Sequence, residues 1–243
     1  MDILTIILFG IVVLTTHFLE GITGFGCTVL ALPFCTMLVG IKTAVPVLVV
    51  LAWILALYII IIDFKNIKWE EFFKIAAFVG LGLPVGILLF SYLPEGVLKI
   101  ILGIFMIIVS IRGLYISFTK NTIVKNINKY LLNFILFLGG IIHGAFGSGG
   151  PFVVIYAAKA LPNKSNFRAT LCTLWFTLNS IIIYKNIKVG AINPLVQKLL
   201  IAVIPFLIVG MILGNVAHHK VKDTVFTKIV YGVLLASGIF MLI

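Results

Sequence analysis

Apolar segments of about 20 residues, the length that crosses the hydrocarbon core of a bilayer, recur along the whole chain. Eight long segments, separated by short polar connections, cover residues 3–19, 43–62, 72–92, 97–117, 130–142, 169–184, 195–216 and 225–243. Two shorter ones cover residues 27–39 and 152–161. Hydrophobic residues make up 62% of the chain and charged residues 10%, so no soluble domain is expected. Because a backbone inside lipid must satisfy its own hydrogen bonds, the pattern predicts an all-α polytopic membrane protein with eight long spans and two short, half-length helices.

Two glycine-rich stretches interrupt this pattern, at residues 20–28 (EGITGFGCT) and 143–151 (HGAFGSGGP). Each glycine weakens a helix by about 1 kcal/mol, and a proline directly after the glycines favours the first turn of a new helix. An unwound backbone persists at membrane depth only where it is buried in protein or lines a water-filled cavity. Each stretch is therefore expected to break a helix beside a functional site, with the second short helix starting at Pro151.

The glycine stretches belong to a longer internal repeat. Three glycines at positions 21, 24 and 26 return at 144, 147 and 149, an offset of 123 residues. The sequence KNIK at residues 65–68 returns at 185–188, an offset of 120. Two matches in the same order predict two homologous transmembrane repeats of about 120 residues, covering residues 1–120 and 121–243.

The relative orientation of the repeats depends on whether the short helices cross the membrane. If they do not, each half has four spans, the repeats are parallel, and ten Lys and Arg face the cytoplasm against eight outside. If they cross as broken helices, each half has five spans, the repeats are inverted, and the distribution is thirteen against five. The positive-inside rule favours the inverted arrangement. The opposing argument is length, because ten helical residues at about 1.5 Å each cover only about half of a ~30 Å core.

A helix that starts just after a glycine turn exposes unpaired N–H groups and the positive end of its dipole, which together favour an anion. Two such starts, near Cys27 or Thr28 and at Pro151, are expected to converge at the repeat axis, and Thr23 offers a further hydroxyl. The candidate substrate-binding residues are Gly24, Gly26, Cys27, Thr28, Gly147, Ser148, Gly149 and Gly150. The alternative is that the glycines only allow close helix packing.

Glu20 and His143 occupy equivalent positions beside the two breaks. A carboxylate inside the membrane is costly and usually functional, and an imidazole titrates near neutral pH, so the pair is a candidate for proton coupling. The alternative places Glu20 at the membrane surface. Arg168 opens a span and is either an interface charge or a residue that steers an anion, while Asn179 and Ser180 either bond a neighbouring helix or line the path.

Other functions fit the sequence poorly. The net charge of +11 comes from basic residues scattered over short loops, which the positive-inside bias explains without nucleic acid. The cysteines lack metal-type spacing, and the adjacent His218 and His219 would point to different faces of a helix, so neither a metal nor another cofactor is expected. Ser148 lacks the glycine two residues earlier that an intramembrane serine protease motif requires, so the protein is not expected to be an enzyme.

In the motifs GITGFG (residues 21–26) and GAFGSGGP (residues 144–151), together with its duplicated layout and length, the chain resembles the sulfite exporter TauE/SafE family of membrane transporters. The resemblance implies a secondary transporter that moves a small sulfur-containing anion, of the sulfite, organosulfonate or thiosulfate type, across the cytoplasmic membrane. Proton coupling is often inferred in this family. The anion, the direction, the coupling ion and a possible homo-oligomer stay open, as does transport of another ion.

Overall fold

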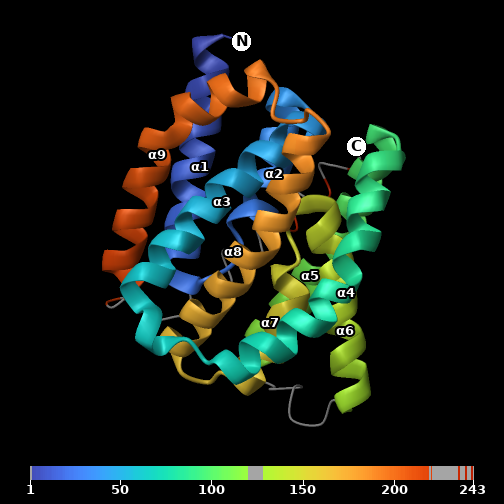
Figure 1. Ribbon diagram of the computed structural model, residues 1–243, viewed down its shortest axis with the longest axis vertical. Coiled ribbons are helices and arrows are strands. Elements are labelled where there is room, and N and C mark those ends of the chain that lie inside the picture. Colours follow the sequence, from blue (N-terminus) through green and yellow to red (C-terminus); the bar gives the residue numbers. More distant parts are fainter. Residues whose placement is uncertain are drawn as a thin grey trace.

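The computed structural model describes residues 2–119 and 128–218 and the single positions 220, 235, 239 and 242, and all regular structure in them is helical (Figure 1). The elements are α1 (Ile3–Thr23), α2 (Cys27–Val39), α3 (Ile41–Asp63), the 3₁₀ turn η1 (Phe64–Asn66), α4 (Trp69–Tyr92), α5 (Glu95–Thr119), α6 (Lys129–Phe146), α7 (Gly150–Ala160), α8 (Lys164–Lys188) and α9 (Pro194–His218). In this described part, seven helices are long and apolar enough to cross a membrane, and α2 and α7 are the two short apolar helices. The eighth expected long segment, residues 225–243, lies outside the described residues.

Large apolar side chains cover much of the outer surface of the helix bundle. Leu81 of α4 is 67% exposed and Ile201 of α9 is 72% exposed, and many others on the long helices resemble them. A soluble protein rarely exposes continuous apolar surface of this kind, whereas a lipid bilayer solvates it. The protein is therefore a multi-pass membrane protein whose lipid-facing surface is formed by the long helices.

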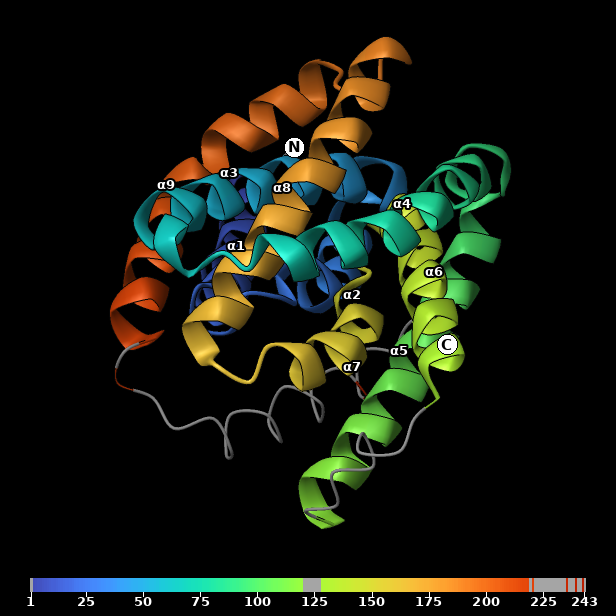
Figure 2. The same cartoon turned by 60° about the horizontal axis from the view of Figure 1, so that its bottom comes forward.

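Each short helix folds back toward the end of the bundle from which the preceding long helix came. A Cβ atom on Gly139 of α6 would lie 3.1 Å from the Cβ of Phe152, so α7 packs against the helix that leads into it. Farther along α7, the Tyr156 hydroxyl donates to Glu71 Oε2, 2.7 Å away near the start of α4. In the first half, the N-terminus and the junction of α2 with α3 lie at the same end of the molecule (Figure 1). Figure 2 shows α2 and α7 between α1 on one side and α6 on the other.

Helices α3 and α8 run antiparallel through the middle of the bundle. At one end the Lys68 N–H donates to Thr170 Oγ1 (3.0 Å), so the end of α3 lies near the start of α8. At the other end Lys185 Nζ lies 5.8 Å from the Phe90 ring centroid, and Lys42 Nζ, at the start of α3, lies 4.4 Å from the same ring. The two KNIK segments therefore lie at opposite ends of the pair formed by α3 and α8. An inverted arrangement of the repeats requires that these two helices run in opposite directions.

Some of the motif glycines serve close helix packing. A Cβ on Gly144 of α6 would lie 2.2 Å from the carbonyl oxygen of Leu83 in α4. Its counterpart Gly21 in α1 would place a Cβ 3.0 Å from the Cα of Gly214 in α9. Small residues let helix backbones approach in this way. For these two glycines the packing interpretation is correct, so the glycines that break the helices are a separate set.

Candidate functional site

The first break is a chain reversal made by two glycines. Gly24 follows α1 with φ 81°, and its N–H donates to the Glu20 carbonyl oxygen over 2.7 Å. Gly26 precedes α2 with φ 104°. Side chains with a Cβ rarely adopt these left-handed conformations, so glycine at both positions lets α1 end and α2 start within three residues.

The second break also begins with a glycine in a left-handed conformation that ends the preceding helix. Gly147 follows α6 with φ 64°, and its N–H donates to the His143 carbonyl oxygen over 2.7 Å. Helix α7 then begins at Gly150, one residue before the expected start, with Pro151 in its first turn. Proline fits there because its missing N–H would have no partner within the helix.

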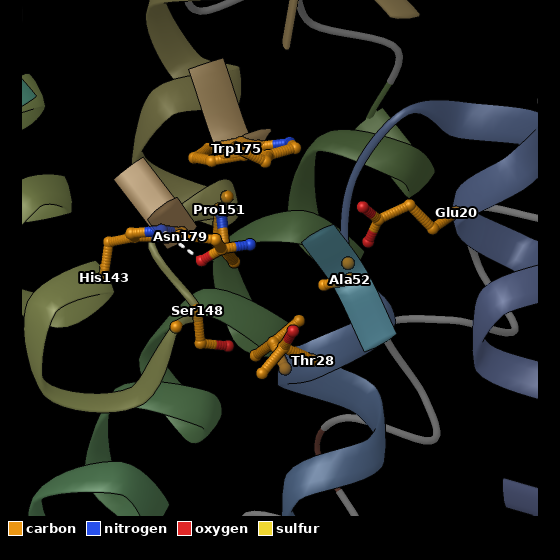
Figure 3. Close-up of a pocket in the computed structure, with 12 residues that line it drawn as sticks. Glu20, Thr28, Ala52, His143, Ser148, Pro151, Trp175 and Asn179 are labelled. Carbon is orange, nitrogen blue, oxygen red and sulfur yellow. Dashed lines mark hydrogen bonds between the residues drawn. The ribbon is translucent and has the colours of Figure 1, made fainter. Parts of the chain in front are cut away.

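Both breaks border one small buried cavity (Figure 3). It is lined by Glu20, Gly26, Thr28, Val29, Ala52, His143, Gly147, Ser148, Gly150, Pro151, Trp175 and Asn179. Its volume of about 20 Å³ holds about one water molecule. The structure thus brings most of the residues singled out in the sequence to one place. The remaining three, Gly24, Cys27 and Gly149, lie directly beside them in the two breaks.

Glu20 is buried inside the bundle and is only 3% exposed, so it is not a solvated surface carboxylate. Its Oε2 accepts a hydrogen bond from the Cys27 N–H over 2.7 Å, at the first residue of α2. Figure 3 shows the carboxyl group pointing toward the cavity. The positive end of α2, where a solute anion was expected, therefore already faces a carboxyl group of the protein itself.

His143 plays the matching part at the second break. The Gly149 N–H, just before α7, points at His143 Nδ1 over 3.4 Å, and Nε2 lies 3.0 Å from Asn179 Oδ1. Since the Gly149 N–H donates, Nδ1 accepts, and Nε2 carries the hydrogen that bonds Asn179. The ring stacks on Trp175 with centroids 5.1 Å apart. A neutral imidazole therefore satisfies both of its ring nitrogens.

Ser148 contributes a hydroxyl that has no partner. The residue is 3% exposed, and among the described residues nothing hydrogen-bonds its Oγ. The hydroxyl points toward Thr28 across the cavity (Figure 3), while Thr28 Oγ1 itself lies 3.6 Å from Cys27 Sγ. Buried polar atoms in native proteins are nearly always hydrogen-bonded, so an orphan that lines a cavity indicates an ordered water or a ligand there.

Arg168 is a structural residue, and the idea that it steers an anion is wrong. It is fully buried and donates to the Asp63 carboxylate, to the Gly21 carbonyl oxygen (2.8 Å) and to Asn215 Oδ1 (3.1 Å). The guanidinium therefore joins the end of α1 to α3 and α9, and its charge is compensated by Asp63.

Of three other polar residues singled out in the sequence, Thr23 differs from expectation, while Asn179 and Ser180 each fit one of the alternatives. The Thr23 hydroxyl donates to the Leu19 carbonyl oxygen (2.9 Å) in its own helix and does not line the cavity. Of the neighbours left open in α8, Asn179 lines the cavity, while Ser180 Oγ accepts from Trp53 Nε1 (2.8 Å).

Trp175 is the hydrogen-bonding cavity residue that the sequence interpretation missed, along with the apolar Val29 and Ala52. It stacks on His143 and donates its Nε1–H to the Gly24 carbonyl oxygen over 3.0 Å, so it contacts both breaks. A tryptophan in the middle of an apolar span needs a partner for its N–H, and this is the one sequence signal that pointed to it.

These features define a class: a helical multi-pass membrane protein in which two glycine breaks enclose a small polar cavity, as in membrane transporters with discontinuous helices. The chain belongs to the sulfite exporter TauE/SafE family, whose model matches residues 8–241 of its 243. No curated protein and no solved structure matches it. Family membership indicates a membrane transporter of sulfite or related sulfur anions, which agrees with the expectation that the protein is not an enzyme.

Proposed function

We propose that the protein is a secondary transporter of a small sulfur-containing anion, of the sulfite, organosulfonate or thiosulfate type, in the cytoplasmic membrane. The observation that carries the proposal is that the starts of α2 and α7 border the same buried cavity. Each helix start directs the positive end of its dipole toward this cavity. The unpartnered Ser148 hydroxyl adds a donor. The cavity, its hydrogen-bond donors and the family membership together favour an anion as the transported solute.

The proposed transport mechanism uses two inverted repeats, residues 1–120 and 121–243, related by a pseudo-twofold axis in the membrane plane. Helix packing supports this: α1 packs along α9 and α6 along α4, so each broken helix contacts a long helix of the other half. Two lysines at corresponding places also make corresponding contacts. Lys42 Nζ, at the start of α3, donates to the Phe90 carbonyl oxygen in the last turn of α4 (2.6 Å), and Lys164 Nζ, at the start of α8, donates to the His218 carbonyl oxygen at the end of α9. Rocking of one half against the other then opens the cavity to each side in turn.

Proton coupling is assigned to Glu20, with His143 as its partner at the second break. Two unit negative charges about 4 Å apart repel by about 4 kcal/mol at the effective dielectric constant of a protein site near solvent. An ionised Glu20 therefore opposes a solute anion in the same cavity, and protonation removes the repulsion. Anion and proton consequently favour each other's binding, which couples their movement.

A hydrolase that uses Ser148 as its nucleophile is not favoured by the geometry. A serine nucleophile needs a base hydrogen-bonded to its hydroxyl. Among the described residues Ser148 Oγ has no such partner, and both nitrogens of the nearby His143 are engaged by Gly149 and Asn179.

The test is transport by the purified full chain in proteoliposomes. Uptake of sulfite, thiosulfate and sulfoacetate is measured with and without an imposed pH gradient, with sulfate and chloride as comparison solutes. We expect at least one of the three sulfur anions to move faster than chloride and to respond to the gradient. Equal movement of chloride would favour a transporter of another ion, and no movement of any solute would contradict the proposal.

A further inference from the structure

The two helix starts that face the cavity offer a solute anion different surroundings. At the start of α2 the Cys27 N–H is already bonded to Glu20 Oε2 (2.7 Å). Glu20 is the one acidic side chain among the described residues that line the cavity. The second break is instead faced by His143 and Asn179, which are bonded to each other and carry no charge as arranged. An anion therefore meets less repulsion beside α7 than beside α2.

The two breaks also differ in the side-chain hydrogen-bond donors that they offer an anion, and the difference again favours the second break. Ser148 lies 123 residues after Phe25, so the hydroxyl at the second break corresponds to an aromatic ring at the first. The Phe25 ring packs near the start of α7, where a Cβ on Gly150 would lie 3.5 Å from its Cδ2. The Ser148 hydroxyl is 3% exposed, has no partner among the described residues and points into the cavity (Figure 3). A free donor thus lies at the break that lacks a carboxylate.

We infer that the solute oxyanion binds at the second break alone, where the Ser148 hydroxyl donates to its oxygens beside the positive end of the α7 dipole. Glu20 fills the equivalent place at the first break as a built-in carboxylate. This assignment presupposes the proposed transport of sulfur anions and names the half of the cavity that recognises them. It requires a solute with a negatively charged, hydrogen-bond-accepting oxygen, which sulfite, thiosulfate and sulfonates share.

The assignment predicts that hydroxyl removal at the two breaks has unequal effects. Sulfite and thiosulfate binding to the purified full chain in detergent is measured by titration calorimetry. A hydrogen bond to a charged group contributes enough that Ser148→Ala is expected to weaken binding about ten- to hundredfold. Ser148→Thr, which keeps the hydroxyl, is expected to recover part of the loss. Thr28→Val is expected to weaken binding by less than about threefold, because it removes no donor at the second break.

Ser110→Ala is the matched control. Ser110 in α5 is fully buried like Ser148, but its hydroxyl already donates to the Met106 carbonyl oxygen (2.6 Å), and it does not line the cavity. Its loss is expected to leave the dissociation constant unchanged. Unchanged binding in Ser148→Ala, or a larger loss in Thr28→Val than in Ser148→Ala, would overturn the inference and leave the proposed function standing. A wild-type protein that neither binds nor transports sulfite or thiosulfate would overturn both.

Discussion

The two glycine breaks share their backbone turn but differ in how the rest of the protein holds them. At the first break three side chains donate to the exposed carbonyl oxygens at the end of α1: Arg168 to Gly21, His218 to Ile22 and Trp175 to Gly24. At the second break, no side chain of the described residues donates to the carbonyl oxygens of residues 144–147. Glycine determines the turn in both places, whereas neighbouring side chains determine how firmly it is held.

This difference indicates different roles for the two breaks. A helix end with several carbonyl groups bonded by side chains resists movement, because each of those bonds must break before the end can shift. The first break then acts as a fixed support that carries Glu20. The second break, which carries the unpartnered Ser148, is freer to adjust around a solute.

Arg168→Ala is expected to have the largest effect, because it removes the main support of the first break. The change breaks the pair with Asp63 and leaves that carboxylate without its guanidinium partner. Removing one partner of a buried ion pair costs about 3–5 kcal/mol. The measurement is the unfolding midpoint in detergent. An Arg168→Ala protein that unfolds at the wild-type midpoint would mean that the first break does not depend on this support.

Gly144→Ala is expected to destabilise the protein more than Gly21→Ala does. At Gly144 the new methyl group would lie 2.2 Å from a backbone oxygen, which side-chain adjustment cannot relieve, whereas at Gly21 the closest atom is 3.0 Å away. Overpacking of this kind costs about 1–3 kcal/mol, and we expect less than about 1 kcal/mol at Gly21. Unfolding midpoints and the monodisperse fraction of each purified variant are compared. Equal losses would show that the two helix contacts are equally tight.

Glu20→Gln is expected to lower stability by about 1 kcal/mol, since an amide accepts the Cys27 N–H less strongly than a carboxylate does. Its main effect is on coupling: the anion binds nearly as it does to the protein with a protonated Glu20, while the response of flux to a pH gradient disappears. His143→Ala is expected to reduce that response only in part. Both are measured as sulfite flux in proteoliposomes. Unchanged pH-driven flux in Glu20→Gln would show that coupling lies elsewhere.

Trp175→Phe is expected to have the smallest effect. It keeps an aromatic ring beside His143 but loses the hydrogen bond to the Gly24 carbonyl oxygen, worth about 0.5–1.5 kcal/mol. Amide hydrogen exchange should accelerate at residues 24–28 and stay the same at residues 147–150. If exchange rises equally at both segments, Trp175 holds the two breaks together and does not support the first one alone.

Sequence alone predicted the features that depend on local chemistry. Segment length and apolar composition predicted the described helices, and Gly24, Gly26 and Gly147 lie where the backbone needs a positive φ. Both breaks line the cavity that the sequence placed beside them. These inferences succeeded because glycine conformation and lipid solvation act on each segment separately.

Features that depend on partners distant in sequence were not predictable. Glu20 is buried because α1 packs against α9 and α2, and its own helix gives no sign of that depth. Asp63 and Arg168 are 105 residues apart, and nothing in either segment identifies the other. Trp175 has one residue of each break as a partner, so its role appears only once both breaks are in place.

A membrane that stores energy as a proton gradient loses it through any protein that holds a continuous file of water molecules. The cavity between the breaks has a volume of about 20 Å³, room for about one water, and that water could not by itself form such a file. A sulfur oxyanion is larger than one water molecule, so the space between the breaks must enlarge before such a solute can enter it.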